Sequence, residues 1–330
     1  MGLCSILGFT NGHRAQRGAA KLLATRVKDV MTDYVLTIPP EKTVVEAAAM
    51  MVGEDVSTLV VEKEEKPIGI LTERDFIMKV PASQKALKLT VGEVTGAKAS
   101  RPLITVTPEM TLKQARDALK QHKIRKLVVV DKEGRAIGIV TQTDLSKALY
   151  KHVTVVAQVS DGQLHVEDVM TTKLVAVEKR AGFATAKRLM MQHHLSAIPV
   201  TERHEYVGIF TEYDVVTQFY DAGGRLDIKE IPELMKTPIK AIPADLNIFD
   251  ANTIMLFEKV RRLMVVEGKK VVGVVTQTDL VHACFDYAEM LRERHARGEQ
   301  PRRKDFITLR KRDAIISEYA GEHVRAFTMR

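Results

Sequence analysis

The chain has 330 residues, of which 45% are hydrophobic and 28% are charged, and its formal net charge is +8. These values are typical of a globular protein with a sizeable core, divided into two or three ordinary domains. Cys4 and Cys284 lie far apart and outside any metal-ligand spacing. This excludes a disulfide framework and a cysteine-based zinc site, and it indicates a cytoplasmic location.

The first predicted segment is an N-terminal tail, residues 1–26, which carries basic but no acidic residues. Its apolar start, Met1 to Phe9, is too short for a membrane-spanning helix and lacks the features of a secretory signal. Ile6 stands where N-myristoylation requires Ser or Thr. We therefore expect no membrane span and no lipid anchor in this tail.

A seven-residue pattern then recurs four times: Gly, two apolar residues, Thr, two variable residues and Asp. The copies are Gly69 to Asp75, Gly138 to Asp144, Gly208 to Asp214 and Gly273 to Asp279. The aspartates, at positions 75, 144, 214 and 279, are therefore 65 to 70 residues apart. Such a period predicts one supersecondary unit for each copy.

Other features recur in phase with this pattern. An opening segment such as Val27-Lys28-Asp29-Val30-Met31-Thr32 precedes a short extended run that ends in proline. A helix follows, and capping signals announce it in three units; they are Thr43 with Glu46, Thr111 with Gln114, and Asn247 with Asp250. Two β-rich runs, for example 126–130 and 136–140, follow this helix, and the second contains the start of the signature. The predicted unit is β-α-β-β-α, so the fold class is α/β.

A unit of this size cannot bury both faces of its sheet, so neighbouring units are expected to pair. The turn signal Ser160-Asp161-Gly162 separates the second unit from the third. The predicted organisation is a tail (1–26), a first pair (27–150, repeats 27–83 and 91–150), a linker (151–162), a second pair (163–285, repeats 163–222 and 228–285) and a basic extension (286–330).

The in-phase signatures and openers resemble those of the cystathionine-β-synthase (CBS) domain family over residues 27 to 285. The resemblance implies two Bateman modules, each a pair of repeats with adenosyl ligands in its cleft, packed as a disc. With four repeats and no attached catalytic domain, the chain is similar to the γ regulatory subunit of the AMP-activated protein kinase and to stand-alone CBS-domain proteins.

The signature lies where the last strand turns into the closing helix, and the free N–H groups of that helix favour a phosphate. A threonine hydroxyl can donate to the ligand, and an aspartate can accept from a ribose diol. The resemblance implies these roles for the four threonines and four aspartates, which are Thr72, Thr141, Thr211, Thr276, Asp75, Asp144, Asp214 and Asp279. The alternative from the residues alone is that each Thr-x-x-Asp is a capping box.

Before their second strand, the even-numbered units carry Arg125-Lys126 and Arg261-Arg262, where the odd-numbered units carry Ser57-Thr58 and Ser196-Ala197. The resemblance implies that these basic pairs contact phosphates; the alternative is a strand edge kept polar by charge. We expect the strongest sites at the even-numbered signatures, because the odd-numbered ones lack a local cation. The adenine side is expected around Thr37, Ser57, Thr58, Thr105, Val175, Ser196, Ala197 and Ala241.

The predicted function is a non-catalytic regulatory sensor that binds AMP, ADP or ATP and signals occupancy to a protein partner, with no metal and no catalytic cofactor. Alternative ligands are S-adenosylmethionine or a cyclic dinucleotide. A homodimer is an alternative assembly. A nucleic-acid role would rest on the basic C-terminal stretches 302–304 and 310–312. An enzyme would need a site such as His193-His194 with Glu202 or His204, and no catalytic motif accompanies these residues.

Overall fold

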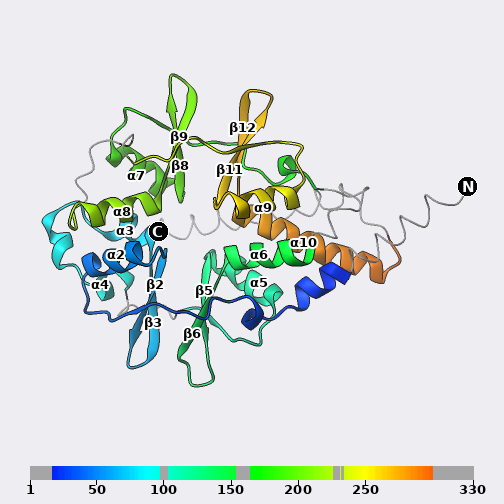
Figure 1. Ribbon diagram of the computed structural model, residues 1–330, viewed down its shortest axis with the longest axis horizontal. Helices are drawn as coiled ribbons and strands as arrows, with labels where there is room; N and C mark the ends of the chain where they lie inside the picture. Colours follow the sequence, from blue (N-terminus) through cyan, green and yellow to red (C-terminus); the bar gives the residue numbers. More distant parts are fainter. Residues whose placement is uncertain (1–16, 97–102, 154–163, 226–230, 232–233, 300–330) are drawn as a thin grey trace, which may run out of the picture.

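Each of the four repeats contains a three-stranded sheet and two helices, as the sequence predicts (Figure 1). The computed structural model describes residues 17–96, 103–153, 164–225, 231 and 234–299. Most of the N-terminal tail, the linker beyond residue 153 and the basic stretches after residue 299 lie outside these ranges, so the predictions made for them stay predictions.

The bounds of the main elements follow the same order in every repeat. The first repeat contains β1 (Thr37–Ile38), α2 (Val44–Gly53), β2 (Thr58–Lys63), β3 (Lys66–Thr72) and α3 (Glu73–Lys79). The second contains β4 (Thr105–Val106), α5 (Leu112–His122), β5 (Lys126–Val130), β6 (Ala136–Thr141) and α6 (Gln142–Val153). The third contains β7 (Val177–Glu178), α7 (Phe183–Gln192), β8 (Ala197–Glu202), β9 (Glu205–Thr211) and α8 (Glu212–Asp221). The fourth contains β10 (Ala241–Pro243), α9 (Ile248–Phe257), β11 (Arg262–Glu267), β12 (Lys270–Thr276) and α10 (Gln277–Ala296).

Within each repeat the first strand pairs in parallel with the second, and the second pairs with the third as an antiparallel hairpin. The opening segments form short helices, namely η1 (Val27–Asp29), α4 (Val91–Thr95) and η4 (Val166–Asp168), and η2 (Gln84–Lys88) precedes α4. The prediction β-α-β-β-α is confirmed. Two closing helices cross the predicted boundaries of their repeats: α6 continues three residues into the predicted linker, and α10 continues into the predicted extension as far as Ala296.

The predicted helix caps are confirmed in two repeats and corrected in one. Thr43 and Glu46 form a reciprocal capping box, and so do Thr111 and Gln114. Asn247 caps α9 by accepting from the backbone N–H of Phe249 at 2.8 Å, so the expected reciprocal bond from Asp250 is absent from this cap. The third repeat begins its helix α7 at Phe183, after the N-cap residue Gly182, which has no capping side chain, as the sequence indicates.

The opening segments cross between neighbouring repeats and hold each pair together. Thr32 of the first repeat exchanges two backbone hydrogen bonds with Ile139 of the second, at 3.0 and 2.9 Å. Thr171 and Val274 repeat this exchange in the second pair. A Cβ on Gly138 would lie 2.8 Å from Met31 Sδ and 3.0 Å from the Thr32 carbonyl oxygen. The signature glycine is therefore needed because the partner's opening segment lies directly on it.

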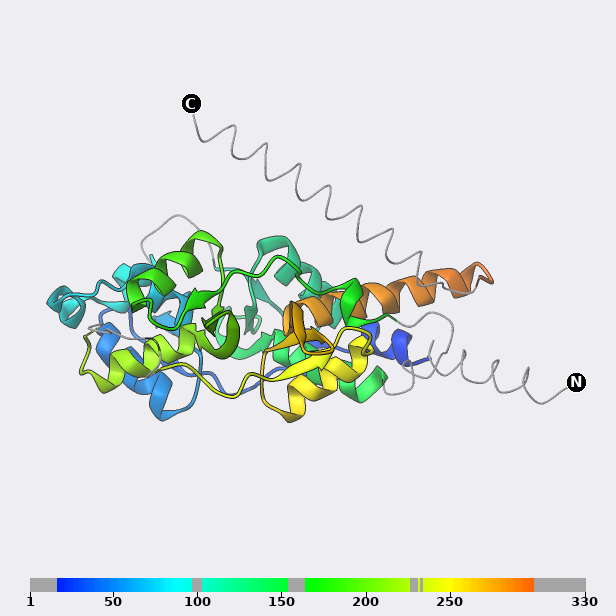
Figure 2. The ribbon, with the colours of Figure 1, turned by 90° about the horizontal axis from the view of Figure 1, so that it is seen from above.

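The hydrophobic cores, in contrast, join repeats of different pairs. Helix α8 of the third repeat packs on α2 and α3 of the first, and α6 of the second packs on α9 and α10 of the fourth. One core accordingly combines the first and third repeats, and the other combines the second and fourth. The opening segments contact the neighbour's strands within pairs, and helices pack between pairs, so the four repeats close into a flat disc (Figure 2).

Candidate functional site

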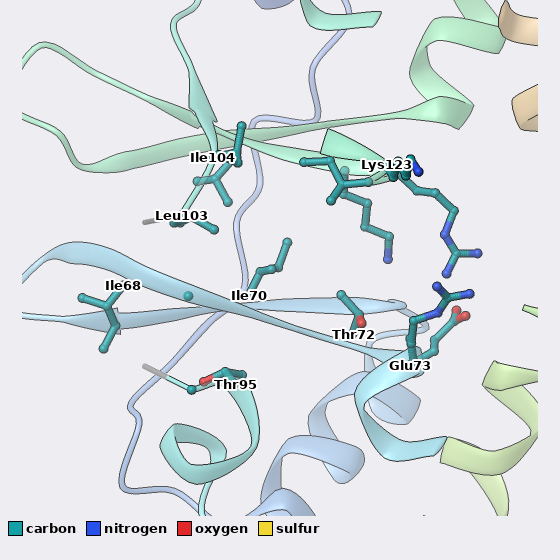
Figure 3. A pocket seen from close by; sticks show the side chains of 15 residues that line it. Ile68, Ile70, Thr72, Glu73, Thr95, Leu103, Ile104 and Lys123 are labelled. Carbon is teal, nitrogen blue, oxygen red and sulfur yellow. The ribbon is translucent and has the colours of Figure 1, made fainter. Parts of the chain in front are cut away.

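The first cleft lies between the sheets of the first and second repeats and has a volume of about 300 Å³. Its apolar wall comes from both repeats and includes Ile68, Ile70, Leu103, Ile104, Ile124 and Val128. Figure 3 shows Ile70 and Ile104 facing the same space, with Thr72 and Glu73 at one end. Arg74, Arg125 and Lys126 also line that cleft. It therefore joins an apolar wall to a cationic end.

The second cleft lies between the third and fourth repeats and has a volume of about 380 Å³. Ile209, Ile239 and Met264 contribute apolar surface, and Thr211 occupies the place that Thr72 has in the first cleft. Its cations are more numerous; they are Lys236, Lys240, Lys259, Arg261 and Arg262. The two clefts are thus built on one plan: with Lys123 included, the first has four cations and one carboxylate, and the second has five cations and two carboxylates.

The expectation that the odd-numbered signatures lack a cation is wrong. Arg125 and Lys126 belong to the second repeat but line the cleft that contains Thr72. Arg261 and Arg262 of the fourth repeat likewise line the cleft that contains Thr211. Pairing of the repeats brings the basic residues of one repeat to the signature of its neighbour, which a reading along the chain does not reveal.

The predicted partners of the basic pairs do meet them. Lys126 Nζ donates to the Ser57 carbonyl oxygen at 2.8 Å, to Ser57 Oγ at 2.6 Å and to Thr58 Oγ1. Arg262 donates to Ser196 Oγ at 3.2 Å. These contacts join the first repeat to the second and the third to the fourth. Ala197 follows Ser196 in β8, where it is buried and pairs with Thr211.

The residues expected around an adenine in the opening strands do not line either cleft. Thr105 and Ala241 are exposed, and Thr37 and Val175 are partly buried in the first and third repeats. The cleft walls contain residues slightly earlier in the chain instead, Leu103 and Ile104 in the first cleft and Ile239 and Lys240 in the second. These cleft residues lie one or two positions before the first residues of β4 and β10.

All four Thr-x-x-Asp segments form capping boxes. In each, the Thr hydroxyl and backbone N–H donate to one aspartate oxygen, Oδ2, at 2.7 to 2.9 Å. The alternative role considered for these residues, capping of the closing helix, is therefore found in every repeat. It leaves open a ligand role for the second oxygen, Oδ1.

That second oxygen has a different environment in each repeat for which a contact is known. Asp75 Oδ1 lies 2.9 Å from Lys79 Nζ, whereas Asp214 Oδ1 lies 3.8 Å from Lys236 Nζ, a residue of the second cleft. Burial raises the pKa of Asp214 and of Asp144. Asp144 lines a separate hollow of about 560 Å³ beside residues 21–30, away from Arg125 and Lys126.

Two buried glutamates were not identified from the sequence. Glu212 at the start of α8 accepts from Arg74 Nε and from an Arg125 Nη, both at 2.8 Å, and so connects the first three repeats. Burial alone would raise the pKa of Glu212, but the two guanidinium groups outweigh it and hold that pKa below its usual value. The sequence does contain a signal that distinguishes these glutamates: the odd-numbered signatures have Glu after Thr, whereas the even-numbered signatures have Gln.

Glu73 makes the corresponding link between the first and the fourth repeat. Both of its carboxylate oxygens accept from Arg261 of the fourth repeat, at 3.1 and 3.2 Å. Glu73 lines both clefts. Each cleft therefore contains an arginine that is held by a carboxylate from the other pair of repeats.

Two cations near the disc centre carry a cost of burial. Burial lowers the pKa of Lys126 to about 7, with Glu73 opposing this change and Arg261 adding to it. Burial likewise lowers the pKa of Arg262 to about 10, and Arg261 adds to that effect. Such cations are stabilised by an added anion, because it favours their charged forms.

The structure does not gather the candidate catalytic residues, His193-His194 with Glu202 or His204, into one site. His193 caps the end of α7, and His204 lies in the turn between β8 and β9. Glu202 pairs with Lys179 at 3.0 Å. Across the described ranges, no cluster of three or more His, Cys, Asp or Glu residues could hold a metal ion. No helix within those ranges combines the length and apolar character needed to cross a membrane.

Comparison with known proteins places this geometry in a family. The CBS domain model matches residues 27–82, 91–151, 166–221 and 228–286. Protein MJ1404 of Methanocaldococcus jannaschii is 31% identical over 166 residues, which cover 47% of this chain but only 38% of that protein. Protein MJ1225 of the same organism is 27% identical over 202 residues, covering 58% of this chain and 69% of that protein.

A solved structure of one of these relatives has the same fold. The crystal structure of MJ1225, described as a candidate archaeal homologue of γ-AMPK, matches with a TM-score of 0.67 at 18% identity, over 78% of this chain and 99% of that one. The structure of CBSX2 in complex with AMP matches a shorter part, 37% of this chain and 97% of that one, at 25% identity and a TM-score of 0.32. The four matched segments cover most of the chain, which therefore belongs to the CBS domain family.

Proposed function

We propose that this protein is a non-catalytic sensor that binds adenine nucleotides in the two clefts and passes their occupancy to a protein partner. The observation that carries the proposal is the composition of each cleft, an apolar wall that ends at a threonine-headed helix start and a pair of cations. A nucleotide has the complementary chemistry, since its base is largely apolar and its phosphates are anionic. The cleft volumes suit small ligands.

Charge supports a phosphate-bearing ligand over S-adenosylmethionine. Arg125 and Lys126 at the first cleft, and Arg261 and Arg262 at the second, would attract phosphates through charge-assisted hydrogen bonds. They would repel the sulfonium cation of S-adenosylmethionine.

Occupancy would be transmitted through the contacts between the two pairs of repeats. A phosphate in the first cleft competes with Glu212 for Arg125 and Arg74, and a phosphate in the second competes with Glu73 for Arg261. The ligand thereby binds unequally to states in which these bridges are intact or broken, which is the requirement for shifting their populations. Breaking these bridges would change the surface at the centre and edges of the disc, and a protein partner would bind to that altered surface.

Isothermal titration with adenosine, AMP, ADP, ATP and S-adenosylmethionine tests the proposal. We expect two sites per chain and an AMP affinity at least about tenfold above that of adenosine, because at least one hydrogen bond to a charged group is added. Leu103→Glu should eliminate the first site and Ile239→Glu the second, since each places a carboxylate in an apolar wall beside the ligand. Leu87→Glu, at an exposed position away from both clefts, is the matched control.

A chain that binds none of these ligands, or in which both wall variants keep two sites of unchanged affinity, would show that the clefts are not nucleotide sites. Preference for S-adenosylmethionine over AMP would count against the charge argument while leaving the clefts as adenosyl sites.

A further inference from the structure

A basic hollow lies at the rim of the second repeat, between the C-terminal half of α6 and the helical residues 17–24. Its volume is about 560 Å³. Basic and hydroxyl-bearing side chains line it from both walls; they are Lys21, Thr25, Lys147, Lys151 and His152. Leu22 and Leu23 are buried in the core of the second and fourth repeats, so the wall formed by residues 17–24 is fixed to the disc.

The walls of the hollow carry an excess of positive charge. Asp29 and Asp144 also line it, but both already accept hydrogen bonds at the starts of their own helices. Lys147 and Lys151 face them from α6. The segment 17–29, which forms the other wall, exposes four cations before Asp29; they are Arg17, Lys21, Arg26 and Lys28.

Lys21 and Lys151 come from different walls and lie near the same imidazole. Burial lowers the pKa of His152, and the charges of Lys21 and Lys151 lower it further. Within the described ranges neither lysine forms an ion pair, and Lys147 lies 3.8 Å from Asp144 Oδ1. Cations that gather at a concave surface without close counter-charges attract an anionic partner.

An exposed aromatic pair borders these cations. Tyr150 follows Lys147 by three residues on α6, so the two side chains are neighbours on one face of the helix. Phe257, the last residue of α9, meets the Tyr150 ring edge to face, with ring centres 5.8 Å apart. Helix α9 packs beside α6 (Figure 1), yet Phe257 is 71% exposed and Tyr150 is 42% exposed. The two rings therefore offer apolar contact next to a row of cations.

We propose that this basic surface, formed by Lys21, Lys147, Lys151 and the Tyr150-Phe257 pair, is the docking site for an acidic segment of the regulated protein. The carboxylates of that segment engage the three lysines, and an apolar side chain beside them covers Phe257. That a regulated protein exists rests on the function proposed above. Binding of an acidic peptide to this surface does not depend on it.

The two aspartates of the hollow favour a peptide over other anionic partners. A layer of lipid headgroups or a phosphodiester backbone carries continuous negative charge, which Asp29 and Asp144 repel. A peptide places its carboxylates one by one and offers backbone N–H groups to the aspartates. The ends of this chain, 1–16 and 300–330, contain more basic than acidic residues, so they lack the charge that complements the surface.

Helix α6 connects this surface to the first cleft. The backbone N–H of Gln142, the first residue of α6, donates to the Arg125 carbonyl oxygen at 3.2 Å, and Arg125 lines the first cleft. A ligand that moves Arg125 therefore moves the start of the helix whose other end carries Lys147 and Lys151. The affinity for the acidic segment should accordingly change when the cleft is occupied.

Fluorescence anisotropy of the full chain with a short labelled peptide of Glu, Leu and Phe tests the surface without any nucleotide. A second peptide has Gln in place of each Glu, and a third has Ser in place of each Leu and Phe. We expect the acidic peptide to bind at least about tenfold more tightly than the Gln peptide, with an affinity that falls as salt is added. The Ser peptide should also bind more weakly, because it cannot cover Phe257.

Substitutions on the surface locate the binding site. Lys147→Glu and Lys151→Glu should each weaken binding of the acidic peptide by about ten- to a hundredfold, the effect of a lost hydrogen bond between charged groups. Lys66→Glu, at the exposed start of β3, is the matched control and should bind as the wild type does. Phe257→Ser should weaken binding about tenfold through lost apolar burial, whereas Leu87→Ser, at an exposed position of η2, should not.

Vesicles of phosphatidylserine with phosphatidylcholine and a single-stranded oligonucleotide are titrated in parallel. Three results would overturn the proposal: equal affinity for the acidic and Gln peptides, unchanged peptide affinity in both Lys147→Glu and Lys151→Glu, or vesicles or oligonucleotide bound through these lysines by a chain that does not bind the acidic peptide.

Addition of AMP separates this proposal from the nucleotide sensor. A chain that binds the acidic peptide but no AMP keeps the docking site and contradicts the proposed function. A chain that binds both, with a peptide affinity that AMP does not change, contradicts the connection through α6. A peptide affinity that shifts with AMP supports both.

Discussion

Glu212 of the third repeat and Arg125 of the second repeat form an ion pair at 2.8 Å that crosses from one pair of repeats to the other. The Glu212 side chain is 1% exposed, and it also holds Arg74 of the first repeat. This contact makes the cationic end of the first cleft part of the interface between the two pairs. A phosphate-bearing ligand in this cleft, as proposed above, would therefore compete with disc assembly for the same guanidinium groups.

Glu212→Gln should strengthen binding of phosphate ligands and weaken the ligand-free disc. The amide is the side chain of the even-numbered signatures, and it leaves Arg125 and Arg74 without their counter-charge. We expect the ratio of AMP to adenosine affinity to rise several-fold and the free energy of unfolding to fall by about 1–3 kcal/mol. Calorimetry and urea unfolding measure the two effects. An unchanged ratio would mean that Glu212 does not compete with the ligand.

Lys126→Met should gain stability relative to the wild type as the pH falls from 10 towards 7, in addition to a constant loss from the hydrogen bonds that Lys126 makes to Ser57 and Thr58. In the folded chain the pKa of Lys126 is about 7, against 10.5 for an ordinary lysine. Between these values the unfolded chain binds more protons, so wild-type stability rises with pH. The free-energy cost of burying the charged lysine is therefore complete below pH 7 and disappears near pH 10.5. The variant lacks it, so its advantage is largest at pH 7 and shrinks towards pH 10.

Urea unfolding at pH 7 and pH 9.5 measures this difference. One proton changes the free energy of unfolding by at most about 1.4 kcal/mol per pH unit, and partial exposure of the side chain reduces that figure. Lys66→Met, at the exposed start of β3, should show no such pH dependence. If the stability gain of Lys126→Met were equal at pH 7 and pH 9.5, the charge of the lysine would not be its cause.

Arg116→Met should destabilise the contact between the second and fourth repeats without changing either cleft. Arg116 on α5 is 2% exposed and pairs with Asp286 and Glu289 of α10. Removing one member of a buried ion cluster leaves charge uncompensated and costs about 3–5 kcal/mol. Thermal or urea unfolding measures the loss. Lys113→Met, which removes a more exposed partner of Glu289, should cost less than about 1 kcal/mol.

Gly138→Ala and Gly69→Ala should have opposite effects on stability. A Cβ on Gly138 meets Met31 Sδ at 2.8 Å and a backbone oxygen at 3.0 Å, so the opening segment must move, at about 1–3 kcal/mol. On Gly69 the nearest atom is Thr95 Oγ1 at 3.6 Å, an ordinary contact. There, alanine should stabilise by about 0.4–1 kcal/mol through the unfolded state. Equal loss in both variants would mean that the signature glycines serve something other than this contact.

The repeat unit could be read from the sequence because its determinants are local. Capping pairs such as Thr43 with Glu46, the β-rich runs and the in-phase signature depend on residues close together in the chain, and each predicts the same element in the structure. The sequence also shows the difference between odd-numbered and even-numbered repeats, because only the even-numbered ones carry a basic pair before the second strand. The Arg125-Lys126 pair and its hydroxyl-bearing counterparts do meet, since the repeats pair as their order in the chain suggests.

Only the tertiary structure decided which residues share a site. The cations of an even-numbered repeat reach the signature of the odd-numbered repeat before it, because the opening segments exchange between neighbours. Glu212 became a buried bridge because α8 packs across the disc onto the first repeat. Contacts between residues some 90 to 190 positions apart, such as Glu212 with Arg125 and Glu73 with Arg261, depend on how the sheets and helices of different repeats pack, and no local pattern contains that information.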